Sequence, residues 1–301
     1  MGLEMEVGCV IVLYNPREQF FSLIEKILPQ VEHLVLVINS WPEQTRNSFS
    51  KKYRKHKQIT ILENEKNLGL AKAQNQGMEI CKNKQMTHIL LMDDDSVPST
   101  NLVFELKNTW REYEDRAGIV SPNVITDSGF SQKFWMKPTG NLFWKRRPFS
   151  EEIEIFEDVS TTISSGSFFS LELIEKLGGM REDFFIDYID VEWSLRVRKH
   201  QKKIIATNKA WIQHEIGFRK KKSFFGFSFY PTNHSPHRKY YQFRNRMICL
   251  KLYWYSFPAW ACIELVNCFV DAFRTLAWEE EKGEKFWNIL RGTFAGIFYE
   301  N

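Results

Sequence analysis

The first 120 residues alternate between two kinds of segment, and this alternation limits the possible folds more than any other feature of the chain. Short apolar runs, typical of buried strands, lie at 7–14, 33–38, 58–62, 88–92 and 118–120. Segments with helical spacing or helix-forming composition lie between them, at 17–28, 42–55, 70–81 and 101–116. A repeated strand–helix–strand order predicts an α/β layer with a mainly parallel sheet and flanking helices.

The pattern weakens after residue 125 and changes again near residue 217. We predict a strand at 158–163, a helix at 171–177 closed by Gly178-Gly179, a helix at 190–199 and an extended segment at 203–213. A basic, aromatic loop then leads into helical segments rich in Trp, Phe and Tyr. We therefore divide the chain into an α/β domain at 1–217, with halves at about 1–120 and 121–217, and a helical C-terminal region at 218–301.

Composition narrows the class of protein. The 301 residues are 43% hydrophobic and 26% charged, as in a globular chain, and the net charge of +4 is too small to indicate a nucleic-acid partner. Five cysteines without a CxxC pair argue against a disulfide framework or a zinc ribbon and favour a reducing cytosol. We recognise no signal peptide and no apolar stretch of the roughly 18 residues that a spanning helix needs. These features predict a cytoplasmic protein.

Three consecutive aspartates, Asp93, Asp94 and Asp95, close the predicted strand at 88–92. In open α/β sheets, ligands bind beyond the carboxyl ends of the strands. Clustered carboxylates repel one another, and a divalent cation such as Mg²⁺ or Mn²⁺ relieves this and can hold a diphosphate. An acidic turn that only caps the next helix is the structural alternative, and this short motif alone does not exclude it.

Two further segments carry polar side chains at predicted element starts. In the segment at 67–77, Gly69 permits a tight entry into a helix and Asn67 can accept hydrogen bonds from the first backbone donors. Farther along, Asp187, Asp190 and Glu192 are three carboxylates close to a predicted helix start, where the helix field favours an ionised carboxylate. An ordinary capped helix and an ordinary acidic helix start remain the structural alternatives.

Together these segments resemble family 2 glycosyltransferases, and most of all their bacterial rhamnosyltransferase-like branch. The motifs that carry the resemblance occur in the family's order: VLYNP (12–16), NLGLAKAQNQG (67–77), LLMDDDS (90–96), SSGSFF (164–169), GGMREDFFIDYIDVEWSLR (178–196) and HEIG (214–217). Arg291-Gly292 matches an RG motif in the branch's C-terminal helix. The resemblance covers nearly the whole chain and implies a GT-A fold, a Rossmann-like α/β domain whose first half binds the nucleotide sugar and whose second half binds the acceptor.

The resemblance also implies roles for individual residues. Asp95 would ligate Mn²⁺ or Mg²⁺ directly, Asp93 would contact ribose or metal, and His214 would complete the metal or diphosphate site. The remaining nucleotide-sugar residues that it implies are Tyr14, Asn39, Asn67, Gly69, Lys72, Asn75 and Asp94.

On the acceptor side, the resemblance places the catalytic base at Asp190. Direct displacement at an anomeric carbon needs a carboxylate that takes the proton of the acceptor hydroxyl. Asp187 and Glu192 are the alternatives to this base, and Asp187 could instead orient the acceptor. Ser165 and Gly166 would form a wall beside the acceptor, and Trp135, Trp144 and Trp193 are candidate surfaces for sugar stacking.

The chain departs from the family pattern after the second predicted strand. Relatives carry an Asp-Asn pair there, and the Asp reads the pyrimidine base, whereas this chain has Ile38 at that position. Either Asn39 substitutes for that Asp, or stacking and backbone contacts hold the base. Leu13 also replaces the usual threonine before Tyr14.

The C-terminal region adds a possible membrane contact. Its first helix carries Arg238, Lys239, Tyr240, Tyr241, Arg244 and Asn245, which could meet phosphate groups or only pack. In the segment 260–278, Glu264, Asn267, Asp271 and Arg274 recur at helical spacing and leave a broad apolar face. This face could pack on the α/β domain or a second subunit, or lie at the inner leaflet of a membrane. The basic segment at 219–222 would then attract anionic lipids.

The overall expectation is an inverting glycosyltransferase that moves a sugar from a nucleoside-diphosphate donor to a hydroxyl of a surface polysaccharide or lipid-linked glycan. The resemblance favours dTDP-L-rhamnose, with UDP-hexoses and UDP-galactofuranose as the competing donors. Two alternatives from other classes are a nucleotidyltransferase and a non-catalytic scaffold. The turn YNPRE after the first strand has no phosphate-binding glycine, which argues against the former.

Overall fold

The computed structural model describes residues 4–16, 19–42, 49, 51–125, 134–139, 143–148, 153–214, 222–224, 227–229 and 233–300. At 19, 134–135, 138–139, 143–148, 214, 222–224 and 227–229 it describes the backbone alone. The chain forms two compact units. The larger comprises Met1–Lys137, Arg146–Phe185 and Ile189–Glu215, and the smaller comprises Pro138–Lys145, Ile186–Tyr188 and Ile216–Asn301.

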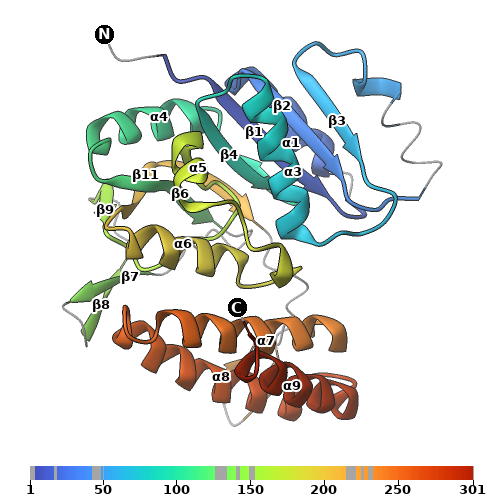
Figure 1. Ribbon diagram of the computed structural model, residues 1–301, viewed down its shortest axis with the longest axis vertical. Coiled ribbons are helices and arrows are strands. Elements are labelled where there is room, and N and C mark those ends of the chain that lie inside the picture. The colour runs from blue at the N-terminus through green and yellow to red at the C-terminus, as the bar shows by residue number, and fades with distance from the viewer. Residues whose placement is uncertain are drawn as a thin grey trace. The chain divides into compact units, whose positions relative to one another are not determined.

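The larger unit is built on a nine-stranded sheet (Figure 1). Its strands are β1 (Val7–Leu13), β2 (His33–Ile38), β3 (Ile59–Glu63), β4 (His88–Asp93), β5 (Ser96–Pro98), β6 (Ala117–Ile125), β9 (Ile155–Glu157), β10 (Phe168–Ser170) and β11 (Lys203–His214). The order along the sheet is β3-β2-β1-β4-β10-β6-β11-β5, and β9 pairs with β11. Pairs among β1, β2, β3 and β4 are parallel, whereas β10 runs antiparallel between β4 and β6.

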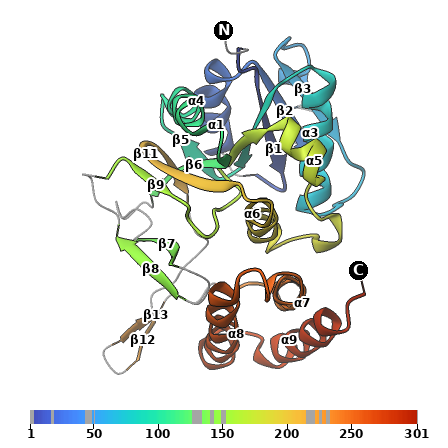
Figure 2. The same cartoon turned by 60° about the vertical axis from the view of Figure 1, so that its left-hand side comes forward.

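Helices cover both faces of this sheet. They are α1 (Gln19–Ile27), α3 (Leu70–Asn83), α4 (Leu102–Tyr113), α5 (Leu171–Leu177) and α6 (Ile189–Lys199), with short 3-10 turns η1 (Leu28–Gln30) and η2 (Glu182–Phe184). Figure 2 shows α1 and α4 on one face and α3 and α6 on the other. The strand order explains why these helices lie on opposite faces. From β1 to β2 the chain moves toward the β3 edge of the sheet, whereas from β3 to β4 it moves in the opposite direction, past β2 and β1. Right-handed crossovers then place α1 and α3 on opposite faces.

The predicted strands of the first half are confirmed. Every residue of β1 and β2 is buried, as expected for parallel strands covered on both faces. The predicted helices at 70–81, 101–116, 171–177 and 190–199 correspond to α3, α4, α5 and α6. Half of the helix expected at 42–55 lies outside the described residues. Residues 51–53 are helical, and Phe49 packs on Phe20 at 5.4 Å between ring centroids.

The strand predicted at 158–163 is wrong. The strand β9 ends at Glu157, and Asp158 adopts a left-handed φ of 60°, which breaks the extended run. The next backbone donors then go to scattered acceptors: Val159 to Ile204 O, Ser160 to Met136 O and Thr162 to the Ser194 hydroxyl. The short strands β5 and β10 had no pattern that could predict them.

The smaller unit consists mainly of three helices, α7 (Pro236–Tyr253), α8 (Pro258–Trp278) and α9 (Lys282–Ile297). Two ribbons, β7 (Phe134–Thr139) with β8 (Phe143–Pro148) and β12 (Lys222–Phe224) with β13 (Phe227–Phe229), complete the described elements. Gly292 allows α9 to approach α7 closely, because a Cβ there would lie 2.3 Å from Tyr240 O. Among the described helices, none combines the length and apolarity needed to cross a membrane.

Candidate active site

The three aspartates lie at the carboxyl end of β4, as the sequence predicts. Asp93 is the last residue of β4, Asp94 and Asp95 form a turn, and β5 begins at Ser96. Because β1 lies next to β4, the residue that follows β1 reaches the same edge, where the Tyr14 N–H donates to Asp94 Oδ2 at 3.1 Å. Asp94 therefore joins the two strand ends, and the Tyr14 side chain is exposed there.

Ser165 forms hydrogen bonds with the residues at both ends of this acidic turn. Its hydroxyl accepts from the Asp93 N–H at 3.1 Å and donates to the Ser96 hydroxyl at 2.7 Å. The Gly166 N–H donates to Leu91 O at 2.7 Å, so the 165–166 segment is bonded to the end of β4. The side chain of Ser165 is fully buried, so only the backbone of this segment could form the expected wall beside the acceptor.

The strand β5 brings the end of β11 to the aspartates. In the antiparallel register of these strands, His214 pairs with Ser96, the residue directly after Asp95. The His214 side chain lies outside the described part of the structure, and among the side chains that are described no three His, Cys, Asp or Glu cluster as metal ligands. The carboxylate oxygens at this edge are of the kind that suits Mn²⁺ or Mg²⁺.

Asn39 organises the loop that precedes α3. Its Nδ2 donates to Asn67 Oδ1 at 2.9 Å and to Gly69 O at 3.2 Å. Its Oδ1 accepts from Asn64 Nδ2 at 3.1 Å and from the Leu68 N–H at 3.0 Å. Two donors and two acceptor positions exhaust the amide group, so Asn39, 2% exposed, has no hydrogen-bonding position left for a base. This arrangement favours stacking and backbone contacts over Asn39 as the interpretation of the departure at residue 38.

Gly69 connects this loop to a second motif. Its φ is 88°, and a Cβ would lie 2.7 Å from Phe185 Cδ2, so only glycine fits at this position. The Gly69 N–H donates to Asn67 Oδ1 at 2.9 Å, so Asn67 closes a turn before α3, whose N-cap is Gly69 itself and carries no side-chain cap. The next residue, Leu70, donates its N–H to Phe185 O at 2.6 Å. The start of α3 therefore fixes the backbone at Phe185, within the motif FFIDYIDVE.

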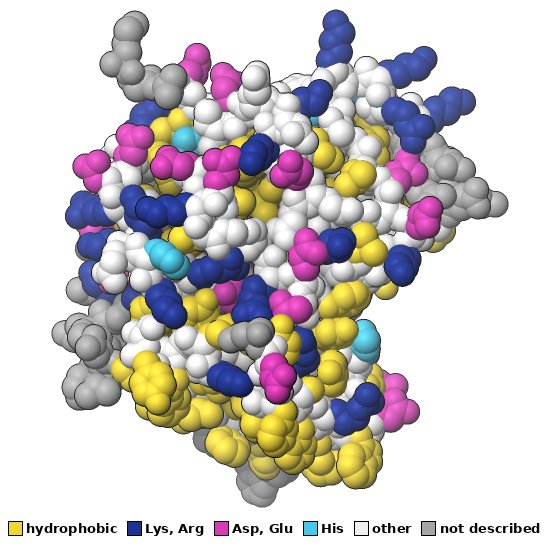
Figure 3. Space-filling model, viewed as in Figure 1, with side chains coloured by type: hydrophobic (Ala, Val, Ile, Leu, Met, Phe, Trp, Pro, Cys, Tyr) yellow, Lys and Arg dark blue, Asp and Glu magenta, His cyan; other side chains and the backbone are white. Residues whose placement is uncertain are grey.

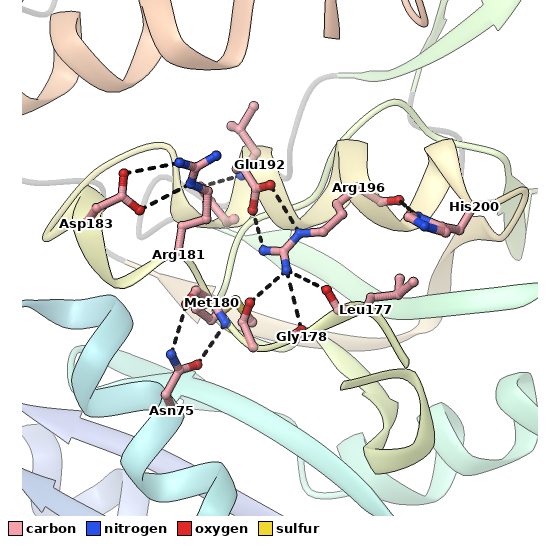
Figure 4. Close-up of polar contacts among 12 residues, drawn as sticks. Asn75, Leu177, Gly178, Met180, Arg181, Asp183, Glu192, Arg196 and His200 are labelled. Atoms are coloured by element: carbon pink, nitrogen blue, oxygen red, sulfur yellow. Dashed lines mark hydrogen bonds and ion pairs between the residues drawn. The ribbon is translucent and has the colours of Figure 1, made fainter. Parts of the chain in front are cut away.

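Lys72 and Asn75 bind the loop before η2. Asn75 Nδ2 donates to Met180 O at 2.9 Å, and Asn75 Oδ1 accepts from the Met180 N–H at 2.7 Å (Figure 4). Lys72, which is partly exposed, pairs with Glu182 at 3.2 Å. These contacts assign Asn75 to holding the loop and leave Lys72 at the surface beside it.

The first turn of α6 carries Asp190 and Glu192 in different surroundings. Asp190 is half-buried, and its Oδ1 accepts from the Val191 N–H at 2.8 Å. Glu192 is 2% exposed and pairs with Arg196 at 2.5 Å. The Arg196 NH1 group also donates to the carbonyls of Leu177 and Gly179, so this guanidinium ties α6 to the preceding loop (Figure 4). The Glu192 carboxylate is therefore held in a buried ion pair with Arg196.

A small crevice opens beside Asp190. Its lining includes Gln74, Ser164 and Trp193. Gln74 Nε2 donates to the Ser164 hydroxyl at 2.7 Å. The Trp193 ring is 2% exposed and packs on Phe169 at 5.6 Å, so it lacks the exposed face that sugar stacking requires. The side chains of Trp135 and Trp144 lie outside the described residues.

Asp187 lies in the smaller unit and is held by an arginine of α7. Arg238 Nε and NH2 each donate to a different Asp187 carboxylate oxygen at 2.9 Å. This bidentate pair stabilises the ionised carboxylate and occupies both of its oxygens. Of the three acidic residues in the motif, Asp187 pairs with Arg238 and Glu192 pairs with Arg196.

Sequence reasoning did not single out Gln74, Ser96 or Arg196. The i to i+4 spacing of Glu192 and Arg196 on a predicted helix was a signal for their pairing. No local pattern could reveal Gln74 or Ser96, since their partners lie 90 and 69 positions away.

Comparisons with known proteins agree with this arrangement. The family model "Glycosyl transferase family 2" matches residues 9–178. The chain is 30% identical over 255 residues to a protein from Shigella flexneri named "dTDP-rhamnosyl transferase RfbF", covering 83% of this chain and 81% of that protein.

Solved structures show the same fold at low identity. A crystal structure of GalNAc-T7 with UDP, GalNAc and Mn²⁺ superposes with a TM-score of 0.63 at 14% identity, over 94% of this chain and 53% of that one. Residues 1–349 of S. aureus TarS in complex with UDP-GlcNAc give a TM-score of 0.52 at 14% identity, over 96% of this chain and 73% of that one. The chain thus spans about half of the GalNAc-T7 structure. It belongs to glycosyltransferase family 2, with a GT-A catalytic fold and helical C-terminal segments.

Proposed function

We propose that this glycosyltransferase moves L-rhamnose from dTDP-L-rhamnose, with inversion, to a hydroxyl of a surface polysaccharide or lipid-linked glycan. The observation that carries the donor is the 30% identity to the dTDP-rhamnosyl transferase, which extends over most of both chains. UDP-hexoses and UDP-galactofuranose are the competing donors, since Ile38 stands where relatives carry a base-reading Asp.

Asp190 is the proposed catalytic base. It would take the proton of the acceptor hydroxyl while the acceptor oxygen bonds to the anomeric carbon and the bond from that carbon to the diphosphate oxygen breaks. Its half-buried place at the start of α6 and beside the crevice supports this role. Asp187 and Glu192 are the alternatives in the same motif, and each pairs with an arginine.

The acidic turn is the proposed diphosphate end of the site. Asp95, Asp93 and His214 would hold Mn²⁺ or Mg²⁺, which when bound would stabilise the charge on the leaving nucleoside diphosphate. Asp94 would keep the turn in place through its bond to the Tyr14 backbone. Tyr14 would line the nucleoside pocket from the end of β1.

Replacing Asp190 with Asn tests the catalytic proposal. We expect the rate of rhamnosyl transfer to fall by at least 10³-fold, as for loss of a general base, while the Kd for dTDP-L-rhamnose changes less than threefold. Asp183→Asn is the matched control, because Asp183 lies nearby and pairs with Arg181 on the surface. Transfer that survives in the Asp190 variant would contradict the assignment of the base.

Donor choice is tested separately by thermal shift with Mn²⁺. A ligand that binds only the folded protein raises the Tm according to its concentration and affinity. We expect dTDP-L-rhamnose to raise the Tm at lower concentration than UDP-glucose, UDP-galactose or UDP-galactofuranose. The reverse order would move the proposal to a UDP-sugar donor.

We further propose that the C-terminal unit contacts the cytoplasmic face of an anionic membrane. Two acidic side chains of α8 face the neighbouring helix α7, where Arg246 donates to Glu264 at 2.8 Å and to Asp271 at 2.5 Å. Its apolar side chains point outward, with Phe269 75% and Phe273 65% exposed. Figure 3 shows hydrophobic side chains gathered over the C-terminal helices.

Two features favour a lipid surface as the occupant of this face. The outward residues of α8 and α9 form long apolar stripes, as in helices that lie in a membrane interface: Val266, Phe269, Val270 and Phe273 on α8, and Phe286, Trp287, Phe294 and Ile297 on α9. From residue 218 onward the sequence has 13 Lys and Arg against seven Asp and Glu. This excess of positive charge complements anionic lipids.

Vesicle flotation tests the membrane contact. We expect the protein to float with vesicles that contain phosphatidylglycerol and to stay behind with phosphatidylcholine alone. Phe269→Ser with Phe273→Ser should remove flotation without lowering the Tm. Phe104→Ser is the control, since Phe104 is 63% exposed on α4 in the other unit. Unchanged flotation of the double variant, or a dimer in solution that the double variant abolishes, would overturn the proposal.

A further inference from the structure

We infer that α7 of the C-terminal unit is a positioning element for the catalytic base. Arg238, Asn245 and Arg246 hold the segment Ile186–Tyr188, and only Ile189 separates that segment from Asp190. The inference rests on the proposed role of Asp190. It assigns a catalytic contribution to a region that otherwise looks like an appendage to the α/β fold.

Asn245 fixes the backbone of the segment. Its side chain is fully buried, and its Nδ2 donates to two consecutive carbonyls, Ile186 O at 2.9 Å and Asp187 O at 3.0 Å. A single amide group that bonds two successive carbonyls sets the orientation of both peptide planes. Few other side chains could replace it, since the task needs two donors in one plane.

Arg238 fixes the side chain of Asp187. Its two parallel bonds at 2.9 Å restrain the carboxylate in orientation as well as position. Arg238 and Asn245 are seven residues apart on α7 and therefore lie on one face of that helix. The same face carries Arg246, whose Nε bonds the Tyr188 hydroxyl.

Tyr188 is the third anchored residue. Its hydroxyl also bonds to Glu264 of α8, and burial raises the pKa of this phenol well above its ordinary value, so it stays neutral. The chain thus has three successive residues of the motif bonded to α7 or α8 through a carbonyl, a carboxylate or a hydroxyl. Each of the three depends on a different side chain of α7.

The backbone of the motif explains why such anchoring is needed. Phe185, Asp187 and Tyr188 have φ values of 58°, 63° and 65°, in the left-handed region that non-glycine residues avoid. Such conformations persist where the surrounding structure over-determines them, and they gather at functional sites. Phe185 is held by the start of α3, and each of the next three residues is bonded to a side chain of α7. A misplacement of about 1 Å at a reacting group can cost roughly 100-fold in rate.

Variants of the ion pair between Arg238 and Asp187 provide the test, because this pair is partly exposed. Asn245 and Arg246 are buried, and their loss could unfold the unit. For Arg238→Gln we expect kcat to fall 10- to 100-fold, with the donor KM and the donor Kd within threefold of wild type. Arg238→Lys keeps the positive charge but cannot donate two parallel hydrogen bonds, so its kcat should lie between those of Arg238→Gln and wild type. Arg274→Gln is the control, because Arg274 is exposed on α8, and it should match wild type.

Two further readouts separate positioning from general stability. Hydrogen exchange should quicken in the peptide that spans 183–191 of Arg238→Gln and not in peptides from α9. In the double variant Asp187→Asn/Arg238→Gln, the loss in kcat should be smaller than the product of the two single losses, since both remove one interaction. A merely structural role would instead lower the Tm and leave kcat per folded molecule unchanged.

The outcomes distinguish this inference from the function on which it rests. If Asp190→Asn is inactive and Arg238→Gln turns over at the wild-type kcat, the positioning role is wrong and the proposed function stands. If Asp190→Asn remains active, the base assignment fails and the inference fails with it. If Arg238→Gln loses kcat in proportion to a loss of folded protein, the positioning role is also wrong.

Discussion

The amide of Asn39 holds the loop at 64–69, and its removal should cost stability more than donor recognition. Asn39→Ala deletes four hydrogen bonds, two donated by Nδ2 and two accepted by Oδ1. Asn67 and Asn64 keep other partners, Gly69 N–H and Gln76 respectively, whereas the Leu68 N–H loses the side chain that satisfies it. At a net value of about 0.5–1.5 kcal/mol per hydrogen bond, we expect the loss of four bonds to cost about 2–6 kcal/mol.

Urea unfolding followed by tryptophan fluorescence would measure this loss, with Asn83→Ala as the control. Asn83 is exposed at the end of α3, so its replacement should change the free energy of unfolding by less than about 0.5 kcal/mol. Donor affinity would be measured on the same variants by calorimetry, below the unfolding transition.

The alternative assignment predicts the opposite pattern. If Asn39 read the nucleobase, Asn39→Ala would lower donor affinity and leave the free energy of unfolding within about 0.5 kcal/mol of wild type. That result would refute the reasoning from the four hydrogen bonds.

Three further perturbations follow from the fold. Burial, with the nearby Lys107 and Arg111, lowers the pKa of His88 from 6.5 to about 4, so the neutral ring is favoured in the folded state. The contribution of His88 to the free energy of unfolding should therefore be fully present above about pH 6.5 and be lost as the pH falls toward 4, by up to about 3 kcal/mol. His88→Phe should reduce this pH dependence in urea titrations at several pH values. An unchanged pH dependence would contradict the effect of His88. Gly292→Ala should lower the free energy of unfolding by about 1–3 kcal/mol, because the added Cβ overpacks against α7. Gly283→Ala is the control: its Cβ meets nothing within 4 Å, so it should leave the Tm unchanged or raise it in a thermal melt. Equal effects of the two substitutions would contradict the close approach of α9 to α7. Arg196→Met should lower the free energy of unfolding by about 3–5 kcal/mol, because it leaves the buried Glu192 carboxylate without its positive partner. The double variant with Glu192→Gln should recover part of that loss in urea unfolding. No recovery would mean that the two residues do not stabilise each other.

Local sequence predicted the α/β layer because its signals are local. A continuous apolar run identifies a strand buried on both faces, and the parallel order of such strands brings their carboxyl ends to one edge. Asp93 and Tyr14 could therefore be placed together from the sequence, and the register of β5 with β11 adds the His214 backbone to that edge.

The roles of Asn39 and Ser165 could not be predicted in this way. Both are polar residues at strand ends, where a side chain can face a ligand or the protein. Asn39 bonds to residues 25–30 positions away, and Ser165 to residues 69–72 positions away. Those contacts depend on how loops fold over the sheet, which no spacing in the sequence encodes.

The sequence by itself determined which residues share a face, and the tertiary structure decided where each face points. Periodicity correctly groups Glu264 with Asp271 on α8, opposite Phe269 and Phe273, but a helix with one polar and one apolar face can turn either one inward. The buried Arg246 decides the matter, because its charge needs carboxylate partners away from water. The apolar face of α8 is therefore left outside, as the surface through which we propose that the enzyme meets its membrane.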